Sequence, residues 1–440
     1  MKMIRKSVMS FAALSIAAVF ASQAQATVTV LGWPGGPEET ALRKAIEIYN
    51  SKSGLSDNDK VEALFFNREG FWDKLQSDLA AGTTEFDINL TATYSLGRYS
   101  PYMEPITLTS NEAYDDKVLA TMQYQGKQYG VPTDLSLHFM YYRSDLIDQL
   151  LSDDDWKKEY RAIAKKTFGK EMDPVNPQNW TWDDYKVTAL FFAKKQNRKS
   201  PVRYGTVLQM KNLLFNMMVW HSAAKAYGGN WLDESGNVVV NSDGYRSALE
   251  RYKSLYDAGS SPKDSLSYEY AEANAAFGAG QAATMLQWNA AAGDLTDASK
   301  NPTIAGKVGI APPPQGPNGR FTHVHGLGFG LNKASTNKEG ARKFLNWLAT
   351  AEAAKAYALA GGNPALRQNV VKDVESQRPD LKTLGEYAGK YGFVMNGGTS
   401  GNALTVYEVQ AREFTGYWAG QQSLDQALEN TEKSMKELLK

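Results

Sequence analysis

The stretch from Lys307 to Asn332 reads KVGIAPPPQGPNGRFTHVHGLGFGLN, and it determines how we divide the rest of the chain. It predicts an apolar strand over 308–311, three consecutive prolines at 312–314, a turn over 316–319, and a second strand interrupted by Gly326, Gly328 and Gly330. Because proline has a fixed φ angle and donates no backbone hydrogen bond, we do not expect the two strands to pair in one sheet. The stretch therefore predicts a crossing between two bodies.

The length and composition of the chain agree with more than one body. The sequence has 440 residues, of which 42% are hydrophobic and 22% are charged. This length exceeds what a single hydrophobic core normally serves, so we expect two or three folded units of ordinary globular type.

The N-terminal segment, from Met1 to Ala26, has the pattern of a secretory signal. Lys2, Arg5 and Lys6 form a basic start, residues 9–20 an apolar segment, and Ala24-Gln25-Ala26 a small-residue cleavage site. The apolar segment is shorter than the ~20 residues that cross a bilayer. We therefore expect an exported protein that starts near Thr27 and stays in the periplasm.

Charge and cysteine content exclude several classes of function. After Ala26 the chain carries 45 basic and 48 acidic residues, a balance that argues against nucleic acid or an anionic membrane as partner. The sequence contains no cysteine, which excludes disulfides, thiol nucleophiles, thiolate metal sites and a lipid-modified cysteine.

The N-terminal third alternates predicted strands and helices, which is typical of a doubly wound parallel sheet. Strands are expected at 27–32, 60–66 and 86–91, with helices between them. In such sheets the loops after the carboxyl ends of strands line the ligand crevice. Trp33, Glu38 and Tyr94 lie in these loops, so they are candidates to contact a ligand; loop packing and helix capping are the alternative roles of Trp33 and Glu38.

Two further crossings between bodies are predicted outside the opening stretch. Gly130 and Pro132 interrupt a β-like segment just before Asp134, whose carboxylate could hold a hinge instead of a ligand. Gly361-Gly362-Asn363-Pro364 breaks the helical pattern nearer the C-terminus. Between them the chain is mainly helical and includes Trp220, Trp231 and a short strand that leads into Trp288 and Asn289.

Several segments together resemble a known family. They are GKQYGVPTDLSLHFMYYRSDL (126–146), YGGNWLDESGNVVVN (227–241), FGAGQAATMLQWNAAAGDL (277–295), KVGIAPPPQGPNGR (307–320) and GLGFGLNKASTNKEGARKFLNWL (326–348). In order and spacing these segments are similar to the extracellular solute-binding proteins of carbohydrate ABC importers, the maltose-binding-protein-like family.

The resemblance implies the two-lobed periplasmic binding protein fold of type II, in the α/β class. Each lobe would be a mostly parallel sheet flanked by helices, and hinge segments would join the lobes. The first lobe would comprise 27–132 and 314–365, and the second lobe would comprise 133–313 and 366–440. The resemblance also implies a monomer that delivers a carbohydrate to membrane permease subunits with a cytoplasmic ATPase, without a cofactor.

A sugar site needs aromatic faces for the C–H surfaces of the rings and polar groups for the hydroxyls. The predicted ligand-binding residues are Trp33, Glu38, Tyr94, Asp134, Trp220, Trp231, Trp288, Asn289, His325, Gly326, Asn363 and Arg367. The motif positions of the family favour Asp134, Trp288, Gly326 and Asn363. Tyr94, Trp220 and Trp231 could equally be core residues.

Other classes of function remain as alternatives. Alternation places His323 and His325 on one face, but with four histidines in the chain and no obvious third ligand we predict no metal site. Arg367 and the helix start behind Gly35-Gly36 could hold an anion, so a glycerol phosphate or a sulfonated glycoside is an alternative ligand. A solute of a different class, such as an amine, is a separate alternative. An exported glycoside hydrolase is less favoured, because the adjacent acids are typical of caps and solvated faces, and the common hydrolase and phosphate-loop motifs are missing. We therefore predict a binding protein and no enzyme activity.

Overall fold

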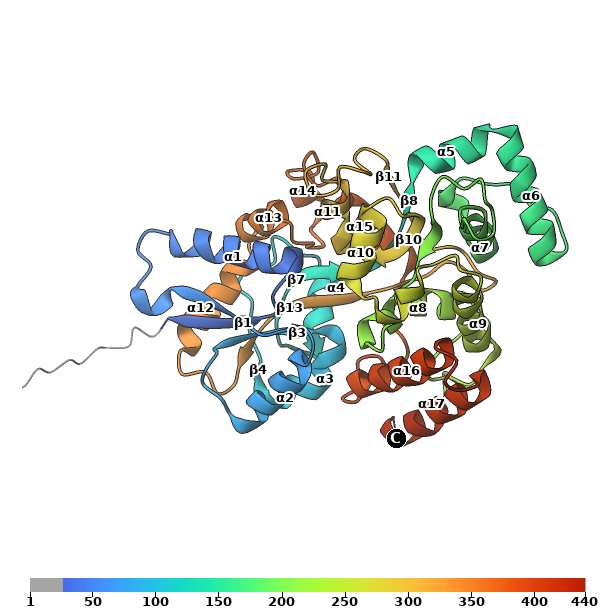
Figure 1. Ribbon diagram of the computed structural model, residues 1–440. Coiled ribbons are helices and arrows are strands. Elements are labelled where there is room, and N and C mark those ends of the chain that lie inside the picture. Colours follow the sequence, from blue (N-terminus) through green and yellow to red (C-terminus); the bar gives the residue numbers. More distant parts are fainter. Residues whose placement is uncertain (1–26, 440) are drawn as a thin grey trace, which may run out of the picture.

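The computed structural model describes residues 27–439, and the predicted signal segment lies outside this range. Two sheets organise the chain into two lobes that lie side by side (Figure 1). We use lobe 1 for the body around the larger sheet and lobe 2 for the body around the smaller one. Within the described residues, no helix is both long and apolar enough to span a bilayer.

Lobe 1 is built on a six-stranded sheet with the order β2-β1-β3-β13-β4, in which β7 also pairs with β13. Strands β1, β2 and β3 are parallel, whereas β13 runs antiparallel to β3, β4 and β7. The strands are β1 (Val28–Gly32), β2 (Val61–Phe65), β3 (Ile88–Ala92), β4 (Met103–Glu104), β7 (Val131–Ser136) and β13 (His325–Asn332).

Lobe 2 contains a four-stranded sheet with the order β11-β8-β10-β9. Strand β8 runs antiparallel to both of its neighbours, and β10 runs parallel to β9. These strands are β8 (His138–Arg143), β9 (Tyr204–Val207), β10 (Ala282–Trp288) and β11 (Val308–Ala311). Shorter strands pair with one another outside the two sheets: β5 (Gln123–Tyr124) with β6 (Lys127–Gln128), and β12 (Thr322–His323) with β14 (Gly392–Phe393).

Helices cover both sheets (Figure 1). Those that accompany lobe 1 include α1 (Gly36–Asn50), α2 (Phe71–Ala81), α3 (Leu96–Tyr99), α4 (Asp116–Leu119), α12 (Lys338–Leu348) and α13 (Ala351–Leu359). Those of lobe 2 include α5 (Ser144–Ser152), α6 (Asp154–Phe168), α7 (Trp182–Phe191), α8 (Leu214–Ala226), α9 (Asp243–Asp257), α10 (Tyr270–Gly278), α11 (Ala292–Thr296), α16 (Ala403–Trp418) and α17 (Leu424–Leu438). Helices α14 (Gln368–Val371) and α15 (Asp380–Tyr391) follow the last crossing.

Helix α1 illustrates how the local sequence produces these elements. Leu42, Ala45, Ile46 and Tyr49 recur at helical spacing, and all four are buried. Gly35 precedes the helix with a φ of 79°, a conformation that suits glycine, and its N–H donates to Glu39 Oε2 at 2.7 Å. The stripe predicted from the sequence is thus the face that packs on lobe 1.

The expected separation of the two strands in the opening stretch is confirmed. Strand β11 belongs to the sheet of lobe 2 and β13 to the sheet of lobe 1. The segment between them passes the start of α7, where Gln315 N–H donates to the carbonyl of Trp180 at 2.8 Å. The three prolines therefore lie on a path from one lobe to the other, as the sequence predicted.

The two-lobed α/β architecture is also confirmed, but the expectation of a mostly parallel sheet in each lobe is wrong for both lobes. Three of the five strand pairings in lobe 1 are antiparallel, and so are two of the three in lobe 2. All of these antiparallel pairings involve β8 or β13, and each of these strands enters its sheet from the other lobe and not through a crossover helix within the same sheet. These direct crossings between the lobes make both sheets mixed.

The glycines of β13 allow a close approach of its neighbour β7. A Cβ built on Gly328 would lie 2.1 Å from the carbonyl oxygen of Val131. The register between β7 and β13 shifts at this point, so that Gly328 opposes Pro132 while Leu327 opposes Asp134. These glycines therefore make room for a neighbouring strand at the first crossing.

We expect Gly328→Ala to destabilise the protein by about 1–3 kcal/mol, because the added methyl group would displace the β7 backbone. Urea unfolding followed by tryptophan fluorescence measures this change. The matched control is Gly385→Ala, where a Cβ meets nothing within 4 Å in the exposed face of α15 and alanine favours the helix by up to about 1 kcal/mol. Equal stability of the two variants would contradict the close approach.

Candidate functional site

A pocket lies between the lobes, and both of them supply its walls. Lobe 1 contributes residues from the loop after β1, the first turn of α1, the loop after β2, and the facing ends of β7 and β13. Lobe 2 contributes residues from the starts of α8 and α10 and from the end of β10. The lining residues are Trp33, Glu38, Arg68, Ser136, Phe215, Tyr270, Trp288, His325 and Leu327.

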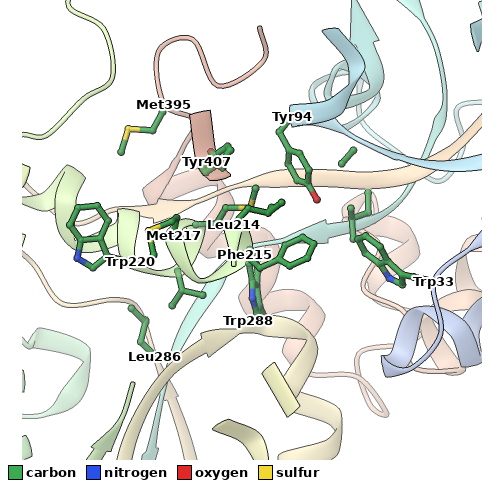
Figure 2. Close-up of a cluster of buried hydrophobic side chains, with 14 of the residues drawn as sticks. Trp33, Tyr94, Leu214, Phe215, Met217, Trp220, Leu286, Trp288, Met395 and Tyr407 are labelled. Atoms are coloured by element: carbon green, nitrogen blue, oxygen red, sulfur yellow. The ribbon is translucent and has the colours of Figure 1, made fainter. Parts of the chain in front are cut away.

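Aromatic rings make up most of the wall (Figure 2). Trp33 packs edge-on against Phe215 from the other lobe, with ring centroids 5.9 Å apart. Trp288 contacts the His325 ring at 5.2 Å, and Tyr94 contacts the same ring at 4.9 Å. Aromatic faces from both lobes thus meet at one place.

Several polar atoms of the pocket are buried without a hydrogen-bond partner in the protein. They are Trp33 Nε1, Glu38 Oε2, Arg68 Nε, Tyr270 OH and His325 Nδ1. Tyr94 OH, which lies next to the pocket, is also unpaired. Buried polar groups in proteins are normally paired, and an exception calls for an external partner. This concentration of unpaired donors and acceptors is typical of a binding site for a hydroxylated molecule.

Glu38 has an unusual electrostatic environment. The residue is partly exposed, but its Oε2 atom is buried. Burial of the carboxyl group, and secondarily the negative charge of Asp134, raises the pKa of Glu38 to about 7, although Arg68 opposes the shift. Near neutral pH this side chain can therefore either accept or donate a hydrogen bond.

The remaining space in the pocket is small. The internal cavity is about 20 Å³, which is enough for about one water molecule. This space is too small for a molecule of the size of a six-membered ring unless the lobes move apart.

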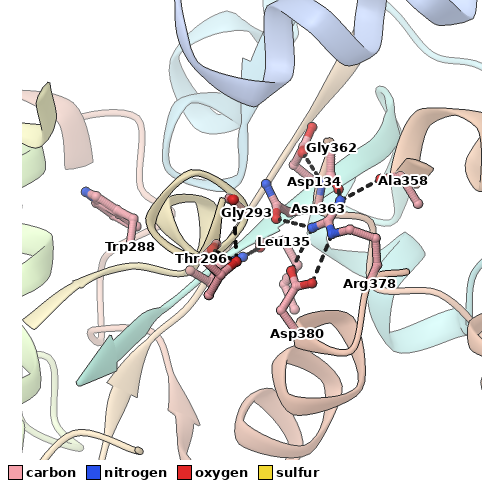
Figure 3. Close-up of polar contacts among 12 residues, drawn as sticks. Asp134, Leu135, Trp288, Gly293, Thr296, Ala358, Gly362, Asn363, Arg378 and Asp380 are labelled. Atoms are coloured by element: carbon pink, nitrogen blue, oxygen red, sulfur yellow. Dashed lines mark hydrogen bonds and ion pairs between the residues drawn. The ribbon is translucent and has the colours of Figure 1, made fainter. Parts of the chain in front are cut away.

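Asp134 holds two of the hinge segments together (Figure 3). Its carboxylate accepts hydrogen bonds from Tyr357 OH at 2.6 Å and from the N–H of Asn363 at 2.7 Å. Arg378 donates to Asn363 Oδ1 at 3.1 Å and forms an ion pair with Asp380 at 2.7 Å. Both oxygens of Asp134 are therefore engaged within the protein, which matches the hinge role that the sequence left open.

The structure brings four of the twelve predicted ligand-binding residues into the pocket: Trp33, Glu38, Trp288 and His325. Tyr94 lies next to them, and Gly326 follows His325 with its backbone N–H bonded to Thr93. Asn289 and Asn363 lie at the crossings, where Asn289 Oδ1 accepts from the N–H of Leu137 at 2.9 Å.

The other predicted residues lie away from the pocket. Trp220 is buried among Tyr245, Phe414 and Trp418 in lobe 2, and Trp231 packs on Tyr407 at 4.7 Å. Arg367 forms an ion pair with Asp115 at 2.9 Å and donates to the carbonyl of Asn111. These contacts account for the three side chains within the protein.

Sequence reasoning missed Arg68, Ser136, Phe215, Tyr270 and Leu327. Arg68 could have been found, because it follows the carboxyl end of β2 just as Trp33 follows that of β1. Phe215 could have been found by the same rule, because α8 is the next element after strand β9, whereas Tyr270 lies at the start of α10, which no sheet strand directly precedes.

All four histidines of the chain form one buried cluster behind the pocket. His323 lies 6.4 Å from His138, 6.2 Å from His221 and 5.6 Å from His325, measured between ring centroids. His221 Nε2 contacts Gln410 Oε1 at 2.7 Å, and His323 Nε2 contacts Tyr407 OH at 2.8 Å. Among the residues that the structure describes, no three histidine or acidic side chains are placed to hold a metal ion.

Comparison with known proteins identifies the family. Residues 44–383 match the family described as bacterial extracellular solute-binding protein. The chain belongs to this family. The resemblance seen in the sequence is confirmed at this level.

Relatives of this solute-binding protein include one from Sinorhizobium fredii named as a probable amino-acid ABC transporter periplasmic-binding protein, y4oP. It is 25% identical over 319 residues, which are 69% of this chain and 65% of that relative's length. The chain thus spans slightly less than two thirds of that relative.

Solved structures share the fold of this solute-binding protein. The maltose-bound MalE3 of T. maritima superposes with a TM-score of 0.77 at 24% identity, covering 94% of this chain and 99% of that one. A solute-binding protein of Thermotoga lettingae TMO bound with α-D-tagatose has a TM-score of 0.75 at 18% identity, covering 94% of this chain and 100% of that one.

We expect Asp134→Ala to lower the free energy of unfolding by about 3 kcal/mol, because Tyr357 OH and the Asn363 N–H would lose their shared acceptor in a buried setting. Chemical unfolding measures the loss. The control is Asp373→Ala, which removes only an exposed ion pair with Lys355 and should cost less than about 1 kcal/mol. A small effect at both positions would contradict the clamp at the hinge.

We expect stability to fall steeply as the pH decreases below about 6.5, the usual pKa of histidine. Burial lowers the pKa of His221 and His325 to about 3, and burial together with neighbouring histidines lowers those of His138 and His323 well below the usual value. The unfolded chain therefore binds protons near pH 5 that the folded protein does not, and each histidine contributes up to about 1.4 kcal/mol per pH unit.

Unfolding free energies measured from pH 7 to pH 4.5 give the number of protons taken up on unfolding. Near pH 5 we expect the histidines to take up three to four protons on unfolding, from which the protons released by Glu38 and Asp134 are subtracted, because burial raises the pKa of these two groups. His325→Gln should take up one proton fewer, and an uptake equal to that of the parent protein would show that His325 is not held neutral in the folded protein.

Proposed function

We propose that this protein captures a sugar or polyol between its lobes and delivers it to the permease of an ABC importer. The observation that carries the proposal is the pocket between the lobes, where aromatic rings surround buried polar atoms that have no partner in the protein. The apolar faces of a sugar can lie on such rings while its hydroxyls pair with the free polar atoms.

The division of the walls between two lobes supports a capture mechanism. A ligand that contacts Trp33 and Glu38 on lobe 1 and Phe215 and Trp288 on lobe 2 stabilises the closed arrangement, because it makes both sets of contacts only there. The crossings at 134–138, 312–325 and 360–367 are the segments about which the lobes would turn.

The comparisons support a carbohydrate as the first ligand class to test. Maltose and α-D-tagatose are bound in two structures of the same fold. The name of the Sinorhizobium fredii relative makes amino acids the natural comparison class.

The remaining parts of the proposal concern export, location, oligomeric state and partner proteins. We propose that residues 1–26 direct export, that the protein works in the periplasm as a monomer, and that its partners are permease subunits with a cytoplasmic ATPase. The bound solute would leave unchanged, since the role of the pocket is binding and not turnover.

The experiment is a binding screen of the chain from Thr27 onward. Mono-, di- and trisaccharides, polyols, sugar phosphates and amino acids are tested by thermal shift and then by calorimetry. At a ligand concentration of 100 Kd we expect a stabilisation of about 2.7 kcal/mol, which is a rise of a few degrees in melting temperature. Exclusive binding of amino acids or phosphates would overturn the carbohydrate class.

We expect Trp288→Ala to weaken binding of the identified sugar at least tenfold, about 1.4 kcal/mol, through loss of the stacking surface. Calorimetry measures the affinity, and Trp288→Phe should retain part of it. Trp156→Ala is the matched control, because Trp156 packs on Phe191 in lobe 2 away from the pocket. Unchanged affinity in Trp288→Ala would remove Trp288 from the site.

A further inference from the structure

The acidic side chains at and near the pocket differ in whether a basic side chain lies beside them. Arg68 is the one basic side chain among the lining residues, and it pairs with Glu269 at 3.8 Å. Asp294, which also acts on Glu38, has its own partner in Lys300 at 2.6 Å. These two acids are therefore neutralised locally.

Glu38 and Asp134 have no such cation of their own. Arg378 lies on the far side of Asp134, but its Nε and Nη2 both donate to Asp380, at 2.9 and 2.7 Å. The carboxyl group of Glu38 makes no ion pair within 4.0 Å among the described residues, and its Oε2 atom has no hydrogen-bond partner. These two carboxyl groups therefore lack a cation in contact with them, and burial raises the pKa of both.

The outer part of the cleft has the same character. A second cavity of about 130 Å³ shares Arg68 and Phe215 with the pocket and extends toward Asp73 of α2 and Glu408 of α16. These two acids face each other from different lobes, and burial together with Asp73 raises the pKa of Glu408. The second cavity thus adds two acidic side chains to the cleft, while Arg68 lines both cavities.

Two atoms in the inner pocket are suited to receive a donor with a positive charge. One is Glu38 Oε2, and the other is Nδ1 of His325, a side chain that is 4% exposed. His325 remains uncharged, because burial lowers its pKa to about 3, and a neutral imidazole nitrogen can accept a hydrogen bond. The ring of Trp288 also lines this part of the pocket and can attract a cation, whereas the ring of Trp33 already has Arg68 over it, 4.8 Å from its centroid.

We propose that the preferred ligand of this site is a hydroxylated amine, such as an amino sugar, whose protonated amino group lies against Glu38. This inference rests on the proposed function and narrows its ligand class. An anionic ligand is disfavoured, since it would discourage ionisation of Glu38 without supplying the cation that this carboxyl group lacks, and Arg68 is already paired with Glu269.

The test compares ligands that differ in charge but share a ring. Glucosamine, galactosamine and mannosamine are measured by calorimetry at pH 6.5 beside the parent hexoses, the N-acetyl hexosamines and the uronates. We expect at least one hexosamine to bind ten or more times more tightly than its parent hexose and its N-acetyl form, and the uronates to bind weakest.

Glu38→Gln should reduce the preference for the amine over its parent hexose to less than threefold. The matched control is Glu39→Gln, one residue further along α1, where the carboxylate pairs with Arg43 at 2.7 Å outside the pocket. Melting temperatures of both variants check that they fold.

The outcomes separate this inference from the proposed function. If a neutral sugar or polyol binds and no hexosamine binds better, the amine preference is wrong and the proposed function stands. If a hexosamine is preferred but Glu38→Gln keeps that preference, the assignment to Glu38 is wrong. If nothing in either set of ligands binds, both proposals fail.

Discussion

A single buried carboxylate ties together the segments on which the two lobes turn. Asp134 lies at the end of lobe 1's strand β7 and accepts hydrogen bonds from Tyr357 and from the backbone of Asn363, in the segment where the chain crosses again. The N–H of Leu135 donates a hydrogen bond to the carbonyl of Asn363 at 2.9 Å. These three hydrogen bonds join the two crossings, and the joined crossings fix how the pocket walls of the two lobes are placed relative to each other.

The same carboxylate also affects the chemistry of the pocket. After burial, its charge is the next cause of the raised pKa of Glu38, so a residue of the hinge also influences the protonation of a residue in the pocket. Aromatic rings that surround Glu38 remove water and strengthen this coupling. Asp134, which joins the hinge segments, and Glu38, which lines the pocket, are therefore coupled through their charges.

Much of the fold could be predicted from patterns that act locally. Three consecutive prolines, the alternation of strands and helices in the first third, and glycines near the crossings all predicted two joined lobes. The mixed order of the sheets could not be predicted, because it depends on pairing between β3 and β13, two strands that most of lobe 2 separates in the sequence.

The pocket was predictable where the rule of strand ends applies, as for Trp33, Glu38 and Trp288. Phe215 and Tyr270 enter it from the starts of α8 and α10, and only the approach of lobe 2 to lobe 1 places them there. Trp220 and Trp231 have the composition expected of a sugar site, yet their rings fill the interior of lobe 2. Residue type alone does not distinguish a pocket wall from a core.

The pairing of β3 with β13 has a consequence for how the protein is made. The central strands of lobe 1 come from residues 28–92, but the strand that completes the sheet ends at Asn332. Until the ribosome has produced that segment, β3 presents an edge with unpaired backbone groups that invites association with other chains. Lobe 1 therefore matures only after most of lobe 2 has been synthesised, and the nascent chain needs protection during that interval.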